Sequence, residues 1–207
     1  DHRDLHSCPT RRSSDLKPGF GAEILDVDLA RAEPDTLAGV VDTFHRHGAI
    51  LLRGQEMSPK QLVDFVALFG EPEDHTQKQF TLPGHPKVFV LSNREADGKP
   101  IGAHNDGVGW HTDYSYKAQP VMCTMLYAVE VPDEGSDTLL ADGCAAWNAL
   151  SPERQKELDG LRLPHSYPPF TATRVFGRQE LPDEPNRDNP VAEHPPTRPH
   201  TAAPPNA

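Results

Sequence analysis

The prolines of this 207-residue chain are unevenly placed, and their placement limits which part can form a regular fold. Eleven of the 22 prolines lie at Pro164 or beyond it. Proline lacks an N–H and restricts the residue before it, so a segment rich in X-Pro pairs is a poor helix or central strand. Residues 168–207 are therefore predicted to be an irregular or disordered tail.

The first sixteen residues also lack the periodicity of a helix or a strand. They are polar and rich in Arg and Ser, and the string from His6 to Leu16 resembles a translated sequencing adaptor. Residues 1–16 are therefore interpreted as a non-native or disordered leader and are excluded from fold reasoning. Residues 17–167 remain, which is long enough for one domain with its own core.

Charge and cysteine content restrict the classes of partner. The formal net charge is −11, and the folded part has no Lys/Arg cluster, which argues against nucleic acid or an anionic membrane as partner. No apolar run approaches the length of a membrane span. Cys8, Cys123 and Cys144 show no paired or metal-type spacing, which predicts a cytoplasmic protein with buried or inert thiols.

Hydrophobic periodicity predicts several short elements. Strand patterns occur over residues 22–29, 49–52, 88–92, 121–131, 137–142 and 161–167. Helical spacing occurs over residues 35–47, 58–69, 143–150 and 151–158. The clearest helix start is Ser58-Pro59-Lys60-Gln61, with a Ser cap, Pro at the first helical position and Gln in the capping-box position. Residues 93–109 are polar and glycine-rich and predict a loop, where binding residues concentrate.

One histidine and one carboxylate follow this loop, two positions apart, at His111 and Asp113. On an extended strand, residues i and i+2 project from the same face, so both side chains could contact one ion. An imidazole and a carboxylate are two thirds of the facial triad that holds non-haem Fe(II). His-x-Asp alone is a weak pattern that also occurs in surface turns, and the spacing leaves both interpretations open.

The order of several motifs resembles the taurine / 2,4-dichlorophenoxyacetate dioxygenase (TauD/TfdA-like) family of Fe(II)- and 2-oxoglutarate-dependent enzymes. The resemblance covers about residues 17–167, and its specificity lies in the joint order of the motifs. These motifs include Ala49-Ile50-Leu51-Leu52-Arg53-Gly54, Leu68-Phe69-Gly70, Trp110-His111-Thr112-Asp113, Gly135-Ser136-Asp137-Thr138-Leu139, Ala149-Leu150-Ser151-Pro152 and Gly160-Leu161-Arg162.

The resemblance implies a mainly β fold with flanking helices, a double-stranded β-helix of the jelly-roll or cupin-like kind, incomplete in this chain. It implies that residues 17–167 form the N-terminal part of that domain. It implies Fe(II) bound by His111 and Asp113. It also implies that Thr138 hydrogen-bonds a carboxylate of 2-oxoglutarate, although Thr138 also fits an ordinary strand residue.

Three further residues are candidates for the substrate site. In some members of the family a histidine at the place of His75 touches the substrate, and a solvated loop histidine is the equal alternative. Asn105 and Asp106 precede the metal motif and are expected to line the pocket.

The implied activity is hydroxylation of a small, anionic organic substrate, with O2 and 2-oxoglutarate consumed and succinate and CO2 released. The implied partners are small molecules, and the intact parent could form a homo-oligomer. Two alternatives remain open: a non-catalytic β-sandwich binding protein, and an inactive truncated relic of the fold. Intact His111 and Asp113 argue against the binding protein, because drift would remove them first.

The family's third ligand, a distal histidine, and the arginine that pairs with 2-oxoglutarate are not recognisable. His165, His194 and His200 are the only histidines after Asp113, and none has the expected context. The chain is therefore predicted to be an N-terminal fragment that is inactive alone.

Overall fold

The computed structural model describes residues 20–104, 109–135, 137–166 and 191–195. These residues fall into two compact units. The first unit contains the described residues up to Gly109 and residues 125–137, and the second contains residues 110–124 and those from Thr138 onward. Each unit is described below by itself.

The first helix of the first unit is α1, Pro34–His47, with proline in its first turn. It ends at Gly48, which takes a left-handed conformation (φ 72°) and donates its N–H to the carbonyl of Phe44 at 2.8 Å. Glycine adopts this conformation without steric cost, so the helix ends where the sequence predicts.

The second helix confirms the predicted capping box. It comprises α2, Pro59–Val66, and continues as a 3-10 turn over Ala67–Phe69 before Gly70. The Ser58 side chain accepts from the Gln61 N–H, and the Gln61 side chain accepts from the Ser58 N–H at 2.9 Å. Two N–H groups that the helix leaves unpaired are thereby satisfied.

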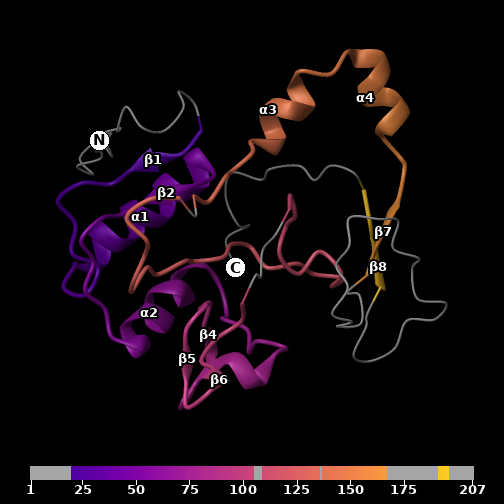
Figure 1. Cartoon of the computed structure of the whole chain (residues 1–207). Coiled ribbons are helices and arrows are strands. Elements are labelled where there is room, and N and C mark those ends of the chain that lie inside the picture. The colour runs from indigo at the N-terminus through magenta and orange to yellow at the C-terminus, as the bar shows by residue number, and fades with distance from the viewer. Residues whose placement is uncertain (1–19, 105–108, 136, 167–190, 196–207) are drawn as a thin grey trace, which may run out of the picture. The chain divides into compact units, whose positions relative to one another are not determined.

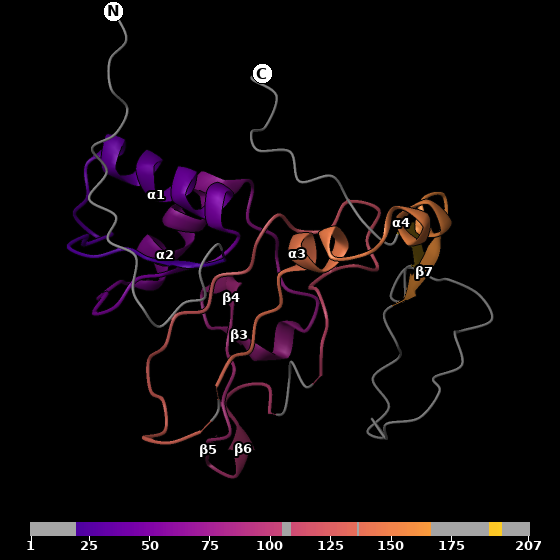
Figure 2. The ribbon, with the colours of Figure 1, turned by 90° about the horizontal axis from the view of Figure 1, so that it is seen from above.

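The core of the first unit joins these helices to a parallel strand pair, β1 (Ala22–Glu23) with β2 (Ile50–Leu51). Its buried members are Ile24, Leu29, Val40 and Phe65. Phe44 of α1 meets Phe69 edge-on, with 5.3 Å between ring centroids. Figures 1 and 2 show α1 and α2 close together in both views. Phe65 of α2 and Phe69 of the following 3-10 turn therefore pack in the core, as their helical spacing predicts.

Two small antiparallel pairs complete the first unit: β3 (Thr81–Leu82) with β4 (His85–Phe89), and β5 (Glu95–Ala96) with β6 (Lys99–Pro100). A short 3-10 turn, Lys78–Phe80, precedes β3. The sequence predicts only a loop for residues 93–109, so the β5–β6 hairpin is a correction. Its turn is Asp97-Gly98, both with positive φ, which is a known hairpin signal.

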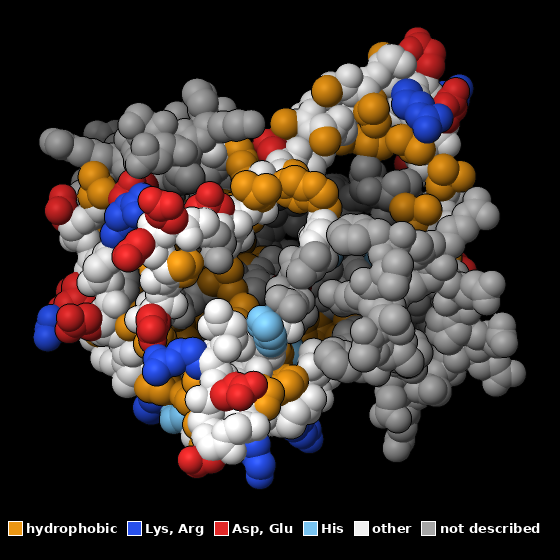
Figure 3. All heavy atoms as spheres, in the orientation of Figure 1, with side chains coloured by type: hydrophobic (Ala, Val, Ile, Leu, Met, Phe, Trp, Pro, Cys, Tyr) orange, Lys and Arg blue, Asp and Glu red, His pale blue; other side chains and the backbone are white. Residues whose placement is uncertain are grey.

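The strands predicted over residues 121–131 and 137–142 are not formed in the described residues. Alternating hydrophobicity indicates an extended segment, but a strand also needs a partner for its backbone groups, and no described strand pairs here. Apolar side chains of these segments are consequently exposed, for example Leu126 (61%) and Val129 (87%). Figure 3 shows hydrophobic side chains reaching the surface on several parts of the visible face.

The second unit contains two helices at the predicted places. Helix α3, Gly143–Asn148, is capped by the Asp142 side chain, and α4, Pro152–Leu158, is capped by Ser151. Both caps accept a hydrogen bond from a backbone N–H of the first turn, which explains why these short helices begin where they do.

A strand pair also lies in the second unit, β7 (Leu163–Ser166) with β8 (Val191–His194), antiparallel. The prediction of an irregular segment is wrong for β8. Pro190 and Pro195 flank these four residues without interrupting them, so every N–H of the strand is present. A residue before proline is also driven toward the extended region, which favours a short strand here.

The described residues thus form four two-stranded sheets with short helices and contain no closed barrel. Within the same residues, no helix is long and apolar enough to cross a membrane.

Candidate metal site

The structure brings the two predicted metal ligands together in the second unit. His111 Nε2 lies 3.2 Å from Asp113 Oδ1. The sequence predicts that both residues lie on a strand. In the structure, His111 lies just before a turn, and the turn begins at Asp113. The donor atoms therefore converge without strand geometry, and the prediction of a strand at this motif is wrong.

The turn after Asp113 has an unusual backbone. Tyr114 takes a left-handed conformation (φ 54°), which a residue with a side chain adopts only at some steric cost. The turn closes through a hydrogen bond from the Lys117 N–H to the Tyr114 carbonyl at 3.0 Å. The Lys117 ammonium lies 4.4 Å from the centre of the Tyr114 ring, and that ring stacks on Tyr116 with 5.7 Å between centroids. These contacts stabilise the strained residue.

A third side chain fixes the carboxylate. Thr124 donates from Oγ1 to Asp113 Oδ2 at 2.6 Å, so one carboxylate oxygen is held while the other faces His111. A hydrogen bond of this length from a hydroxyl to a charged oxygen is among the stronger kinds. The sequence did not identify Thr124, because nothing local shows that a residue 11 positions away would meet Asp113.

The spacing of the two donor atoms fits binding to one ion. Neighbouring ligands on an octahedral ion with bonds of about 2.1 Å lie about 3 Å apart. The observed 3.2 Å is close to this separation. Both side chains remain accessible, at 50% for His111 and 38% for Asp113. An imidazole nitrogen and a carboxylate oxygen also form a suitable donor set for Fe(II) or Mn(II).

No group of three His, Cys, Asp or Glu side chains able to hold a metal occurs among the described residues. The pair His111–Asp113 therefore lacks a third protein ligand in this part of the chain. Cys123, which precedes Thr124 in the sequence, is poorly suited to bind a metal, because burial raises the pKa of its thiol and disfavours the thiolate.

The other predicted site residues are placed separately. Thr138, in the second unit, is exposed and lies outside helices and strands. His75, in the first unit, is half-buried; its ring stacks on Phe89 with 3.7 Å between centroids, and its Nδ1 accepts from the Gln77 N–H at 3.2 Å. These contacts favour the alternative in which His75 has a packing role. Asn105 and Asp106 lie outside the described residues.

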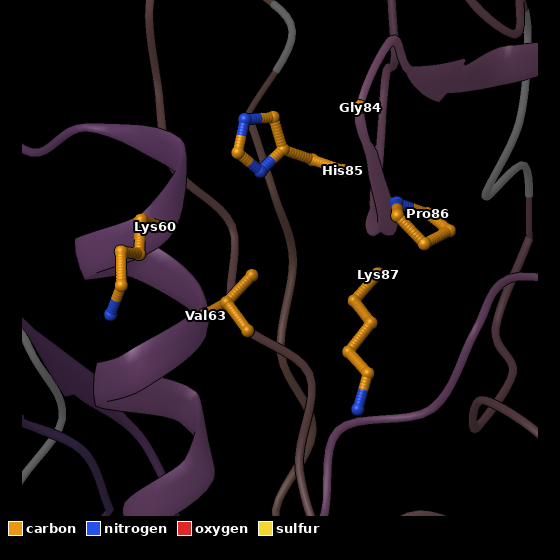
Figure 4. Close-up of a pocket in the computed structure, with 6 residues that line it drawn as sticks. All are labelled: Lys60, Val63, Gly84, His85, Pro86 and Lys87. Carbon is orange, nitrogen blue, oxygen red and sulfur yellow. The ribbon is translucent and has the colours of Figure 1, made fainter.

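A separate hollow of about 170 Å³ occurs in the first unit, between α2 and the β3–β4 hairpin (Figure 4). Its lining residues are Lys60, Val63, Gly84, His85, Pro86 and Lys87. Both lysines already pair with carboxylates, Lys60 with Asp64 at 2.6 Å and Lys87 with Glu71 at 2.5 Å. The hollow contains none of the predicted site residues, so it does not compete with the His111–Asp113 pair as a candidate site.

Comparison with known families gives one match over most of the chain. The model of the family described as "Taurine catabolism dioxygenase TauD, TfdA family" matches residues 12–204.

Curated relatives agree with this match. The chain is 35% identical over 163 residues to an alpha-ketoglutarate-dependent 2,4-dichlorophenoxyacetate dioxygenase of Cupriavidus pinatubonensis, covering 72% of this chain and 56% of the relative. It is 31% identical over 164 residues to an alpha-ketoglutarate-dependent sulfonate dioxygenase of Saccharomyces cerevisiae, covering 73% of this chain and 38% of the relative. It is 31% identical over 142 residues to a pentalenolactone F synthase of Streptomyces arenae, covering 67% and 46%. The chain thus spans about half the length of these relatives.

Solved structures show the same likeness. A taurine dioxygenase from Burkholderia xenovorans aligns with a TM-score of 0.64 and 26% identity, over 90% of this chain and 56% of that one. AAD-2, solved in complex with Mn(II) and N-oxalylglycine, aligns with a TM-score of 0.50 and 21% identity, over 76% of this chain and 51% of that one. At that identity the second alignment shows a shared fold only.

Proposed function

The chain belongs to the TauD/TfdA family of alpha-ketoglutarate-dependent dioxygenases, and from this membership we propose that it serves an Fe(II)-dependent hydroxylation with His111 and Asp113 as metal ligands. Alpha-ketoglutarate is 2-oxoglutarate, the cosubstrate. The observation that carries the proposal is the 3.2 Å approach of His111 Nε2 to Asp113 Oδ1.

Each residue of the site has a distinct role in this proposal. His111 supplies a neutral nitrogen donor, and Asp113 supplies a negatively charged oxygen that offsets part of the metal's charge. Thr124 holds the second oxygen of Asp113, so that the carboxylate presents one oxygen toward His111. When bound, Fe(II) with 2-oxoglutarate supplies the activation of O2 that hydroxylation requires, with succinate and CO2 as by-products.

The exposed hydroxyl of Thr138 is proposed to donate to a carboxylate of 2-oxoglutarate. A hydroxyl can donate to an anion without adding charge, so this role needs a cation elsewhere in the site. We propose that this cation, and a histidine that completes the triad, lie outside the described residues. In the same way, the β-helix domain is proposed to be completed by residues beyond those described.

The proposed substrate is a small organic sulfonate or carboxylate. The names of these relatives refer to taurine, sulfonates and 2,4-dichlorophenoxyacetate, each of which carries a negatively charged sulfonate or carboxylate group. His75, Asn105 and Asp106 remain proposed substrate contacts, and His75 is the weakest of them because its ring is already stacked on Phe89.

The activity is tested by Fe(II)-dependent succinate release from 2-oxoglutarate, with taurine, 2,4-dichlorophenoxyacetate and simple alkyl sulfonates as candidate substrates. The assay compares the full gene product, its Asp113→Ala variant and the 207-residue chain. Substrate-dependent succinate from the full product, lost in Asp113→Ala, supports the proposal. A folded full product that binds Fe(II) but forms no succinate with any substrate supports a non-catalytic binding protein instead.

A further inference from the structure

A buried histidine from β8 contacts the turn that follows Asp113. His194 is only 8% exposed, and its Nε2 lies 2.8 Å from the carbonyl oxygen of Lys117, 77 residues earlier in the chain. A carbonyl oxygen can only accept, so Nε2 carries the hydrogen and donates it. A ring with a hydrogen on Nε2 therefore fits this contact, whereas a ring with its hydrogen on Nδ1 alone does not.

The accepting carbonyl belongs to the residue that closes the turn. The Lys117 N–H bonds to the Tyr114 carbonyl at 3.0 Å, and Tyr114 is the residue in the left-handed conformation. A backbone held in a disfavoured region persists only where its surroundings stabilise it. His194 acts on the end of the turn opposite Asp113, and Thr124 acts on the Asp113 side chain itself.

The orientation of the His194 ring is itself fixed. His194 pairs across the β7–β8 ladder with Leu163, and its ring meets that of His165 edge-on, with 5.6 Å between centroids. A ring that is buried, cross-strand paired and packed against a second ring loses little freedom when it donates to the turn.

We infer that His194 is a positioning residue for the metal pair: its Nε2–H holds the Asp113–Lys117 turn and so sets where the Asp113 carboxylate points. The consequence for metal binding rests on the proposed function, whereas the consequence for the turn does not. His194 acts here through the backbone and not as a metal ligand, because no group of three His, Cys, Asp or Glu side chains that could hold a metal occurs among the described residues, and so none joins His194 to His111 and Asp113.

The experiment uses the metal-free 207-residue chain and amide hydrogen exchange of Lys117, whose N–H closes the turn. His194→Phe keeps a ring but has no N–H, and His194→Gln keeps a donor. We expect exchange about fivefold faster in H194F, the factor for one lost hydrogen bond, and within about twofold of wild type in H194Q. His85→Phe, in β4 of the first unit, is the matched control and is expected to leave Lys117 unchanged. Equal Lys117 exchange in H194F and wild type would overturn the inference.

Two further readouts separate the outcomes. Long-range ¹H–¹⁵N spectra of the wild-type chain report the ring tautomer, and an Nδ1–H form would overturn the inference even if H194F failed to fold.

Mn(II) titration, with the metal alone as probe, is expected to show about tenfold weaker binding in H194F and near-normal binding in H194Q. Wild-type chain that binds no Mn(II) would contradict the metal site while leaving the exchange result to decide the role of His194. Loss of Mn(II) binding in H194Q, with turn exchange unchanged, would identify His194 as a ligand and refute the positioning role.

Discussion

Replacing Thr124 by valine tests how the metal-binding carboxylate is held. The substitution keeps the branched shape of the side chain but removes the hydroxyl that donates to Asp113 Oδ2 at 2.6 Å. Hydrogen bonds to charged groups contribute about 1.5–3 kcal/mol. Thr124 is exposed and the Asp113 side chain is 38% exposed, so water replaces part of the lost contact and about 1 kcal/mol is the appropriate figure. That free energy corresponds to a metal affinity about fivefold lower.

The assay is a titration of the 207-residue chain with Mn(II), in which binding is measured as the loss of the free-ion signal in electron paramagnetic resonance. Thr124→Ser keeps the hydroxyl and is expected to bind within about twofold of wild type. Thr81→Val is the matched control, since the Thr81 hydroxyl donates at 2.8 Å to the Lys78 carbonyl in the first unit. The reasoning is refuted if T124V binds as tightly as wild type, or if T124S is as weak as T124V.

Three other predictions concern the two units separately. Ser58→Ala removes the cap that accepts from the Gln61 N–H, and chemical unfolding should show a loss of about 1 kcal/mol; a loss below about 0.3 kcal/mol would contradict the role of the cap. Tyr127→Phe removes a hydroxyl with two backbone contacts at 3.1 Å, and the same measurement should show a loss of about 1–2 kcal/mol, whereas an unchanged midpoint would argue against those bonds. Burial raises the pKa of the Cys123 thiol, so less of it is thiolate at pH 8, and peptide mapping after brief iodoacetamide treatment should find Cys123 labelled more slowly than the exposed Cys144; equal rates would contradict this.

The helices could be predicted from the sequence because their signals are local. Ser58 and Gln61 satisfy the first N–H groups of α2, and Ser151 does the same for α4, within three residues of each cap. Gly48 ends α1 because its left-handed conformation is easily reached by glycine. The Asp97-Gly98 turn is an equally local signal for a hairpin, although the polar, glycine-rich composition of residues 93–109 predicts only a loop.

The strands were harder to predict because they depend on partners. Alternating apolar residues over 121–131 indicate an extended chain but do not determine whether another strand pairs with it. At Val191–His194 the reverse holds: the surrounding prolines predict an irregular segment, but β8 forms there because β7 supplies a partner strand.

The sequence predicts only part of the site, because some of its contacts are local in the sequence and others come from distant residues. The spacing of His111 and Asp113 places two ligands close together in sequence, and the structure brings their donor atoms to 3.2 Å. The side chains that support them, Thr124 and His194, contact the site from 11 and 77 residues away. No local pattern reveals such contacts, so they required the structure.

The central claim is that His111 and Asp113 bind one metal ion together. Mn(II) titration of the 207-residue chain and of His111→Ala, Asp113→Ala and the double variant tests it most directly. If both side chains contact the same ion, each single variant should lose at least about tenfold in affinity, and the double variant should lose much less than the product of the two. Single variants that bind within about twofold of wild type would contradict the shared site.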